Sequence, residues 1–329
     1  MSKVLITGGC GFVGHHLVEH ILKSTDWNVV VMDKLSYASN GLERLRDIQV
    51  FDDRRVHIMT SDFSIPVSEG MLQELGHVDY IFHLGAETHV DRSIDDPEPF
   101  VTANVTGTMH MLNLARKLPG LKRFFYFSTD EVFGPAGPGV AYKEWNRYNS
   151  GNPYAAAKAG GEELCLAYGN TYKLPVVITH CMNIFGERQH PEKFIPKVIR
   201  AAQSGEKIFI HSDPTKKVPG SRFWIHARNV AAAVAFLVEN GQVQDKYNIV
   251  GEKEVNNLDI ALFIAKTLGK PLNYELVDFH SSRPGHDLRY ALDGAKMHRL
   301  GWRLPRTFEQ SLEKTILWTL ENPKWLGGR

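Results

Sequence analysis

The chain has 329 residues, more than one hydrophobic core usually accommodates, so we expect two domains or one enlarged domain. Hydrophobic residues make up 43% and charged residues 23%, an ordinary globular composition, and the formal net charge is +1. A nearly neutral chain without a long apolar run argues against nucleic acid and against a membrane as partners.

Strand-like and helix-like stretches alternate through the first half of the chain. Short apolar runs rich in β-branched or aromatic residues predict strands, with helical stretches between them. Strands separated by helices favour an α/β fold of the Rossmann type, a doubly wound parallel sheet covered on both faces. The predicted strands are 4–7, 28–32, 56–60, 80–83, 123–128 and 176–180.

The regular alternation stops after residue 180. Four prolines interrupt 186–222, which we interpret as a substrate-side insertion. We therefore expect a Rossmann domain over 1–180 plus about 224–252, and a smaller, interleaved α/β substrate-binding domain over 181–223 and 253–329. Beyond residue 222 the expected elements are helices at 230–240, 257–268 and 307–321, a strand at 247–250 and a loop at 281–286.

The three cysteines are Cys10, Cys165 and Cys181. They are far apart and odd in number, so they predict neither a metal site nor a disulfide framework. Reduced thiols, together with an N-terminus that lacks signal-peptide architecture, predict a cytoplasmic protein.

A glycine-rich turn follows the first predicted strand and opens the first helix. Its glycines are Gly8, Gly11 and Gly14, with Phe12 and Val13 between the last two. Gly8 permits a sharp turn, Gly11 lets a pyrophosphate approach the backbone, and Gly14 lets helix and strand pack closely. The helix N-terminus supplies N–H groups and the positive end of the dipole. This pattern predicts a dinucleotide site.

Asp33 ends the second strand, at the spacing expected of the acid that binds the adenosine ribose. A carboxylate there accepts the ribose hydroxyls and repels a 2′-phosphate, which favours NAD over NADP. The neighbouring Lys34 leaves the choice partly open. Asp62, after the third strand, binds the adenine amino group or caps a helix, and the sequence favours neither.

Tyr154 and Lys158 lie four residues apart on a predicted helix, so they share one face. A nearby ammonium lowers the pKa of a tyrosine, and the lysine can also reach the nicotinamide ribose. Tyr154 is therefore a candidate base towards a hydroxyl. The alternative is a pair of surface residues on an amphipathic helix.

The run Ser128-Thr129-Asp130-Glu131 follows the strand predicted at 123–128. Ligands of open α/β sheets bind at the carboxyl ends of strands. The two adjacent carboxylates can contact different atoms of one substrate. The alternative is an acidic loop that faces solvent.

These three motifs together resemble the extended short-chain dehydrogenase/reductase superfamily. The Thr-Asp-Glu form of the third motif is similar to that of the nucleotide-sugar 4,6-dehydratases, in particular the dTDP-glucose 4,6-dehydratases. Further runs that match this family are 86–93, 190–196 and 283–290.

The resemblance implies an internal redox cycle with NAD on a nucleotide-diphosphate sugar. Tyr154 would take the proton of the sugar 4-hydroxyl while NAD takes up the hydride that it later returns. Glu131 would remove the C5 proton, Asp130 would protonate the departing 6-hydroxyl, and Thr129 would hydrogen-bond the 4-hydroxyl. One carboxyl must be ionised and one protonated, which different surroundings can achieve.

The resemblance also implies residues that bind the substrate and a homodimer. The helices at 102–115 and 154–172 match those that pair subunits in relatives. The implied substrate residues are Glu87 and His89 in a strand-end loop, Asn183, Lys193 and Arg222 for diphosphate or sugar, and Arg283 and His286 nearer the nucleotide.

Several positions depart from the family pattern. Gly85 stands where alanine is usual, Phe133 where tyrosine is usual, and Phe223 and Asn229 where aspartates are usual. These departures leave UDP-glucose as open as dTDP-glucose. A UDP-sugar 4-epimerase and a UDP-glucuronate decarboxylase use the same scaffold but do not need the acid at Asp130. A non-catalytic dinucleotide sensor is the alternative from another class.

Overall fold

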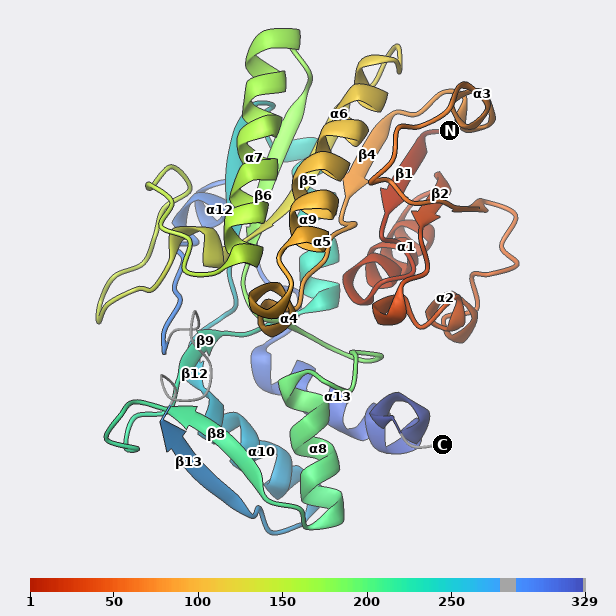
Figure 1. The fold of residues 1–329 in the computed structure, drawn as a ribbon. Coiled ribbons are helices and arrows are strands. Elements are labelled where there is room, and N and C mark those ends of the chain that lie inside the picture. Colours follow the sequence, from red (N-terminus) through yellow and green to blue (C-terminus); the bar gives the residue numbers. More distant parts are fainter. Residues whose placement is uncertain (279–287, 328–329) are drawn as a thin grey trace.

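The computed structural model describes residues 1–278 and 288–327 (Figure 1). A seven-stranded sheet in the order β11-β6-β5-β4-β1-β2-β3 forms its centre, and all neighbouring strands are parallel. The expected Rossmann-type doubly wound sheet is confirmed. Its strands are β1 (Lys3–Thr7), β2 (Asn28–Asp33), β3 (Val56–Thr60), β4 (Tyr80–His83), β5 (Arg123–Thr129), β6 (Val176–Cys181) and β11 (Asp245–Ile249).

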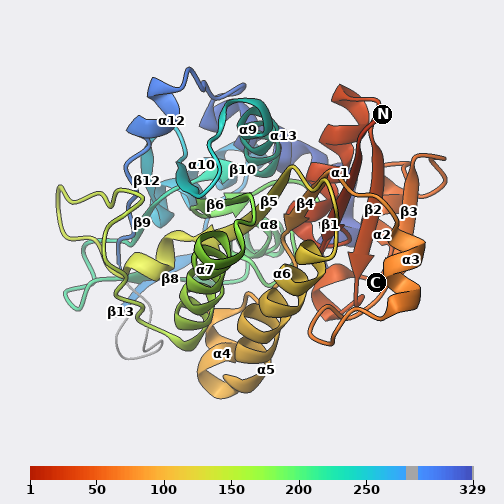
Figure 2. The ribbon, with the colours of Figure 1, turned by 90° about the horizontal axis from the view of Figure 1, so that it is seen from above.

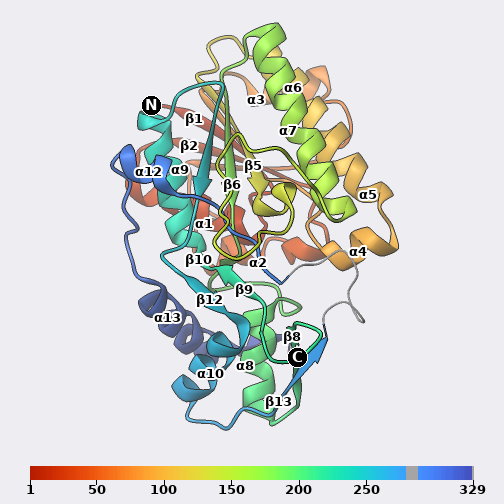
Figure 3. The same cartoon turned by 90° about the vertical axis from the view of Figure 1, so that its left-hand side faces the viewer.

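Helices cover both faces of this sheet (Figures 2 and 3). Alternate residues of β5 face opposite sides of the sheet: Phe125 and Phe127 pack into one apolar core, whereas Phe124 and Tyr126 pack into another. The helices around the sheet are α1 (Phe12–Ser24), α2 (Glu43–Asp47), α3 (Glu69–Leu75), α4 (Val90–Asp95), α5 (Glu98–Val101), α6 (Thr108–Arg116), α7 (Pro153–Tyr172), α9 (Ala227–Asn240) and α12 (Ala295–Arg299).

A second unit with its own apolar core lies below the carboxyl ends of the strands (Figure 1). Three two-stranded sheets pair β7 with β10, β8 with β13 and β9 with β12. The elements of this region are β7 (Ile184–Phe185), α8 (Phe194–Ser204), β8 (Ile208–Ser212), β9 (Ser221–Phe223), β10 (Ile225–His226), β12 (Glu254–Asn256), α10 (Asn257–Leu268), β13 (Tyr274–Asp278) and α13 (Phe308–Glu321).

Two features of the chain path differ from the sequence-based expectation. Helix α8 contains Pro196 as its third residue, where a proline is tolerated because the first helical N–H groups have no partner within the helix. Helix α12 lies against β11, and its Met297 belongs to the core of the main sheet although it follows residue 253. The loop expected at 281–286 lies outside the described residues. No helix in the described parts of the chain is both long and apolar enough to cross a membrane.

Candidate active site

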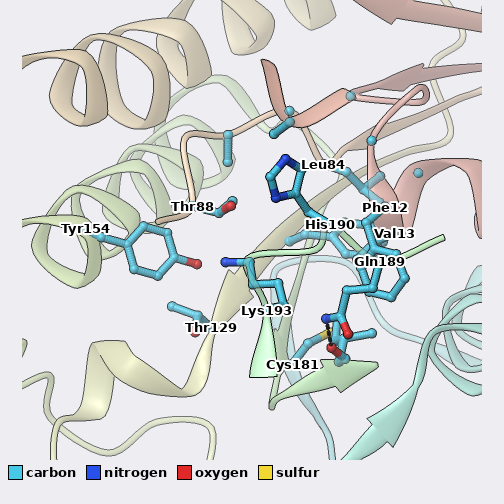
Figure 4. Close-up of a pocket in the computed structure, with 18 of the residues that line it drawn as sticks. Phe12, Val13, Leu84, Thr88, Thr129, Tyr154, Cys181, Gln189, His190 and Lys193 are labelled. Atoms are coloured by element: carbon cyan, nitrogen blue, oxygen red, sulfur yellow. Dashed lines mark hydrogen bonds between the residues drawn. The ribbon is translucent and has the colours of Figure 1, made fainter. Parts of the chain in front are cut away.

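A cavity of about 370 Å³ lies at the carboxyl ends of β1, β2, β4, β5 and β6 (Figure 4), and residues of the second unit line its other side. Strand ends and the first turn of α1 supply one wall, and 189–194 with Trp224 supply the other. The structure brings together fourteen of the predicted site residues in its lining: Gly8, Gly11, Phe12, Val13, Gly14, Asp33, Lys34, Thr129, Asp130, Glu131, Tyr154, Lys158, Asn183 and Lys193.

The glycine-rich turn forms the dinucleotide end of the cavity. Gly8 has a φ of +68°, which favours glycine. A Cβ on Gly14 would lie 2.1 Å from the Gly8 carbonyl oxygen, and one on Gly11 would lie 2.9 Å from the same atom. Helix α1 begins at Phe12 without a side-chain cap, so backbone N–H groups face this end of the cavity. The turn therefore has the close backbone approach that a pyrophosphate needs.

Asp33 lies where the adenosine ribose is expected. Its carboxylate is 6% exposed and accepts hydrogen bonds from the backbone N–H groups of Cys10 at 3.0 Å and Leu35 at 2.8 Å. Each oxygen keeps a further lone pair for a ribose hydroxyl. The Lys34 ammonium lies 2.8 Å from the Glu87 carboxylate, so it is already paired and does not favour a 2′-phosphate.

Asp62 does not line the cavity. Its carboxylate accepts a hydrogen bond from the backbone N–H of Ser64 at 2.8 Å, and the neighbouring Phe63 ring lines the cavity instead. This contact stabilises a local turn, and the next described helix, α3, has Ser68 as its N-cap. Asp62 therefore does not cap a helix, and its contact with adenine stays a prediction.

The side chains predicted to be catalytic converge from two elements. Thr129 ends β5, and a 3₁₀ turn over Asp130–Phe133 follows it directly. Tyr154 and Lys158 occupy the first two turns of α7 and are 9% and 4% exposed. The Thr129 hydroxyl donates to the Asp130 carboxylate at 3.0 Å. Figure 4 shows that Tyr154 and Thr129 point into the cavity from one side and Lys193 from the other.

Burial dominates the protonation of these groups. It raises the pKa of Asp130 to about 7, and the neighbouring Glu131 charge acts in the same direction. Burial lowers the pKa of Lys158 to about 7. The pKa of Tyr154 is raised, first by burial and then by the Glu131 charge, while its hydrogen bond with Thr129 opposes the shift. The sequence-based expectation that Lys158 lowers the tyrosine pKa is therefore not met, because burial and the Glu131 charge set the direction of the shift.

Three predicted substrate residues do not line the cavity. The Glu87 carboxylate pairs with Lys34, and His89 caps α4 and lies 3.7 Å from the Glu192 carboxylate. Residue 88 of the same loop lines the cavity instead (Figure 4). Arg222 donates to the backbone carbonyls of residues 221 and 288, each at 2.7 Å, and its charge still lowers the pKa of Asp130. Arg283 and His286 lie outside the described residues.

Sequence reasoning missed several lining residues in the loop before α8. Gln189 donates from its amide to the Ile184 carbonyl at 2.9 Å (Figure 4), and its Oε1 has no hydrogen-bond partner among the described residues. His190 and Glu192 line the same wall. These three residues lie in or beside the run 190–196, whose match to the family could have indicated them. Only Lys193 of that run was predicted to bind the substrate.

The comparisons with known proteins agree on one family. The model of the NAD dependent epimerase/dehydratase family matches residues 4–250. A dTDP-glucose 4,6-dehydratase from Salmonella typhimurium is 38% identical, with 98% of this chain and 94% of the relative covered. One from Neisseria gonorrhoeae is 37% identical, with 98% of this chain and 96% of the relative covered.

Solved structures of dTDP-glucose 4,6-dehydratases are also similar to this chain. The dTDP-glucose 4,6-dehydratase DesIV from Streptomyces venezuelae, solved with NAD bound, has a TM-score of 0.88 at 34% identity over 98% of both chains. The Bacillus anthracis dTDP-glucose 4,6-dehydratase in complex with NAD has a TM-score of 0.88 at 31% identity over 99% of both. A UDP-glucuronic acid 4-epimerase from Bacillus cereus shares the fold at 24% identity, with a TM-score of 0.87 over 97% of this chain and 99% of that one.

Proposed function

The chain belongs to the NAD dependent epimerase/dehydratase family, and we propose that it is a nucleotide-sugar 4,6-dehydratase that converts dTDP-glucose to the 4-keto-6-deoxy sugar nucleotide. The observation that carries this proposal is the pair Asp130 and Glu131 at the end of β5, in one cavity with Tyr154. An elimination needs one group that removes a proton and another that supplies one, and this pair can divide those roles.

The cavity fits NAD. Its glycine-rich turn closes so tightly that a Cβ on Gly11 or Gly14 would meet the Gly8 carbonyl oxygen, and the start of α1 leaves its backbone N–H groups uncapped for a pyrophosphate. The buried Asp33 carboxylate suits two ribose hydroxyls. When bound, NAD supplies the hydride acceptor and a positive charge. Lys158, on the same helix face as Tyr154, is the residue that we assign to the nicotinamide ribose.

The side chains then divide the proton transfers. Tyr154 accepts the proton of the sugar 4-hydroxyl. Burial and the Glu131 charge raise its pKa, so the phenolate depends on the opposing hydrogen bond with Thr129 and on the positive charge that bound NAD supplies. Glu131 removes the C5 proton once C4 is a ketone, because the ketone acidifies that position. Asp130 holds a proton near neutral pH and gives it to the departing 6-hydroxyl. Lys193, opposite Tyr154 in Figure 4, and Asn183 hold the diphosphate or the sugar.

The rival functions on the same scaffold explain the site less completely. A 4-epimerase or a decarboxylase uses Tyr154, Lys158 and NAD, but has no step for a protonated carboxyl beside the sugar C6. Asp130, whose pKa lies at about 7, is the feature that favours the dehydratase. A non-catalytic sensor would have no use for Tyr154 or for the two carboxyls.

We also propose a homodimer and a cytoplasmic location. Helices α6 and α7 lie side by side on the outside of the sheet (Figure 1). Val101 at the end of α5 is 49% exposed and Tyr172 at the end of α7 is 45% exposed. A second copy seated there would cover both. Light scattering should give twice the mass of one chain.

The three cysteines are free and buried, as is usual in a reducing compartment.

The test is incubation of the purified protein with dTDP-glucose and, separately, with UDP-glucose, followed by mass spectrometry. We expect a product that has lost one water, formed from dTDP-glucose faster than from UDP-glucose, without net consumption of NAD. A product of unchanged mass that separates from the substrate by chromatography would indicate the epimerase. Two unchanged sugars would refute the assignment of Asp130 and Glu131.

A further inference from the structure

Asn152 connects the two parts of the catalytic machinery. It precedes α7, is 6% exposed, and its Oδ1 accepts the backbone N–H of Ala155 at 2.8 Å, which makes it the N-cap of the helix that carries Tyr154. Its Nδ2 donates to Oε2 of Glu131 at 2.9 Å. One side chain therefore joins the start of α7 to the residue that removes the C5 proton in the proposed function.

The orientation of this amide is fixed by its surroundings. A backbone N–H can only donate, so the oxygen of the Asn152 amide must face Ala155 and the nitrogen must face Glu131. An N–H group that points at a carboxyl favours its ionised form, which only accepts. Asn152 thus presents Glu131 with a neighbour that stabilises the base form.

Asp130 has the opposite surroundings. Its Oδ1 accepts the Thr129 hydroxyl at 3.0 Å, whereas its buried Oδ2 has no hydrogen-bond partner among the described residues. A proton on that oxygen removes the cost of a buried negative charge. Because the two carboxyls are adjacent, a negative charge held on Glu131 further favours the proton on Asp130.

We propose that Asn152 is a positioning residue that assigns the roles of the two carboxyls, holding Glu131 ionised and aimed as the base and leaving the proton on Asp130. The proposal rests on the dehydratase function. Since the same side chain caps α7, it also sets the base in register with the helix that carries Tyr154 and Lys158.

The decisive variant is N152D. An aspartate is as good an N-cap as asparagine, so the start of α7 is preserved. Its second oxygen, however, replaces the N–H donor with another negative charge against Glu131, which then takes up a proton. We expect oxidation at C4 to continue while elimination stalls, so the absorbance of enzyme-bound reduced nicotinamide should accumulate with dTDP-glucose.

The expected loss of product formation is about 100-fold or more, the usual contribution of a general base. With dTDP-glucose deuterated at C5, the isotope effect on kcat should increase in N152D, because removal of that proton becomes rate-limiting. N152S, which keeps a capping oxygen but has no amide that reaches Glu131, should show a smaller loss of the same kind.

Asn256 offers a matched control at the start of α10 in the second unit. Its Oδ1 accepts the backbone N–H of Asp259 at 2.8 Å, and its Nδ2 donates to the Asp259 carboxylate at 2.6 Å. N256D therefore makes the same change at a helix cap outside the cavity. We expect it to change Tm as much as N152D does, with activity and isotope effect unchanged.

Two outcomes would overturn the proposal. Product formation in N152D within about threefold of wild type would show that the amide does not govern the base, since a general base contributes far more. The second outcome is that N152D forms reduced nicotinamide and product equally slowly and has a lower Tm than N256D. That result would show that Asn152 acts only as a helix cap. Wild-type protein that makes no dehydrated product would instead refute the function on which the proposal rests.

Discussion

Asp130 is buried beside a second carboxyl, and this location makes its proton available near neutral pH. Burial raises its pKa to about 7, and the Glu131 charge adds to the shift. Because the acid form is required, the rate of elimination should fall as the pH rises through about 7. The measurement is the pH dependence of product formation from dTDP-glucose.

The matched variant for this prediction is D130N, which cannot supply a proton. It should still oxidise C4 but form product about 100-fold more slowly, and it should lose the alkaline decline. An alkaline decline that persists unchanged in D130N would assign the titration to another group.

At the scale of residues, spacing along the chain predicted part of the cavity lining, and burial explains a pKa direction that spacing did not predict. Gly8, Asp33 and the pair Tyr154 and Lys158 follow from distances along the chain, because strand ends and helix faces repeat regularly. The direction in which the Tyr154 pKa shifts could not be predicted from spacing, because desolvation depends on what covers the ring in three dimensions.

At the scale of elements, the departure at Gly85 has a local cause in the turn after β4. A Cβ on Gly85 would lie 2.3 Å from the ring of Phe63, so the alanine usual in the family does not fit beside this phenylalanine. G85A should lower the free energy of unfolding by about 1–3 kcal/mol, the usual cost of an overpacked core. Urea denaturation of the purified variants measures it.

The control for this prediction is a double-mutant cycle with F63L. If the ring causes the clash, G85A should cost much less in the F63L background, with a coupling of about 0.5–3 kcal/mol. Equal costs in both backgrounds would show that Gly85 is needed for its backbone alone.

Long, capped elements were predictable and short pairings were not. Helices α7 and α10 begin and end where the sequence predicts, and Asn152 and Asn256 cap them. The two-residue strands β7 and β10 have no periodicity to detect, and their pairing joins residues about 40 positions apart. Helix α8 was not predicted because Pro196 suggested a helix break. A proline in the first turn does not break a helix, since the first N–H groups have no partner within it.

At the scale of the whole molecule, the cavity exists because the second unit closes over the strand ends of the first. A cofactor that binds only the folded chain stabilises it by RT ln(1 + [L]/Kd), about 2.7 kcal/mol at a concentration of 100 Kd. NAD should therefore raise Tm. NADP at the same concentration should raise it much less, because Asp33 repels a 2′-phosphate and Lys34 is paired with Glu87. Equal shifts would contradict this reading of Asp33.

The central claim is that one site oxidises C4, eliminates water and returns the same hydride to C6. The most direct test uses dTDP-glucose carrying deuterium at C4, with the position of the label in the product read by NMR. We predict a 4-keto-6-deoxy product that has lost one water and carries the deuterium at C6. A product that keeps its mass with the deuterium still at C4, or deuterium released on free reduced cofactor, would contradict the dehydratase assignment.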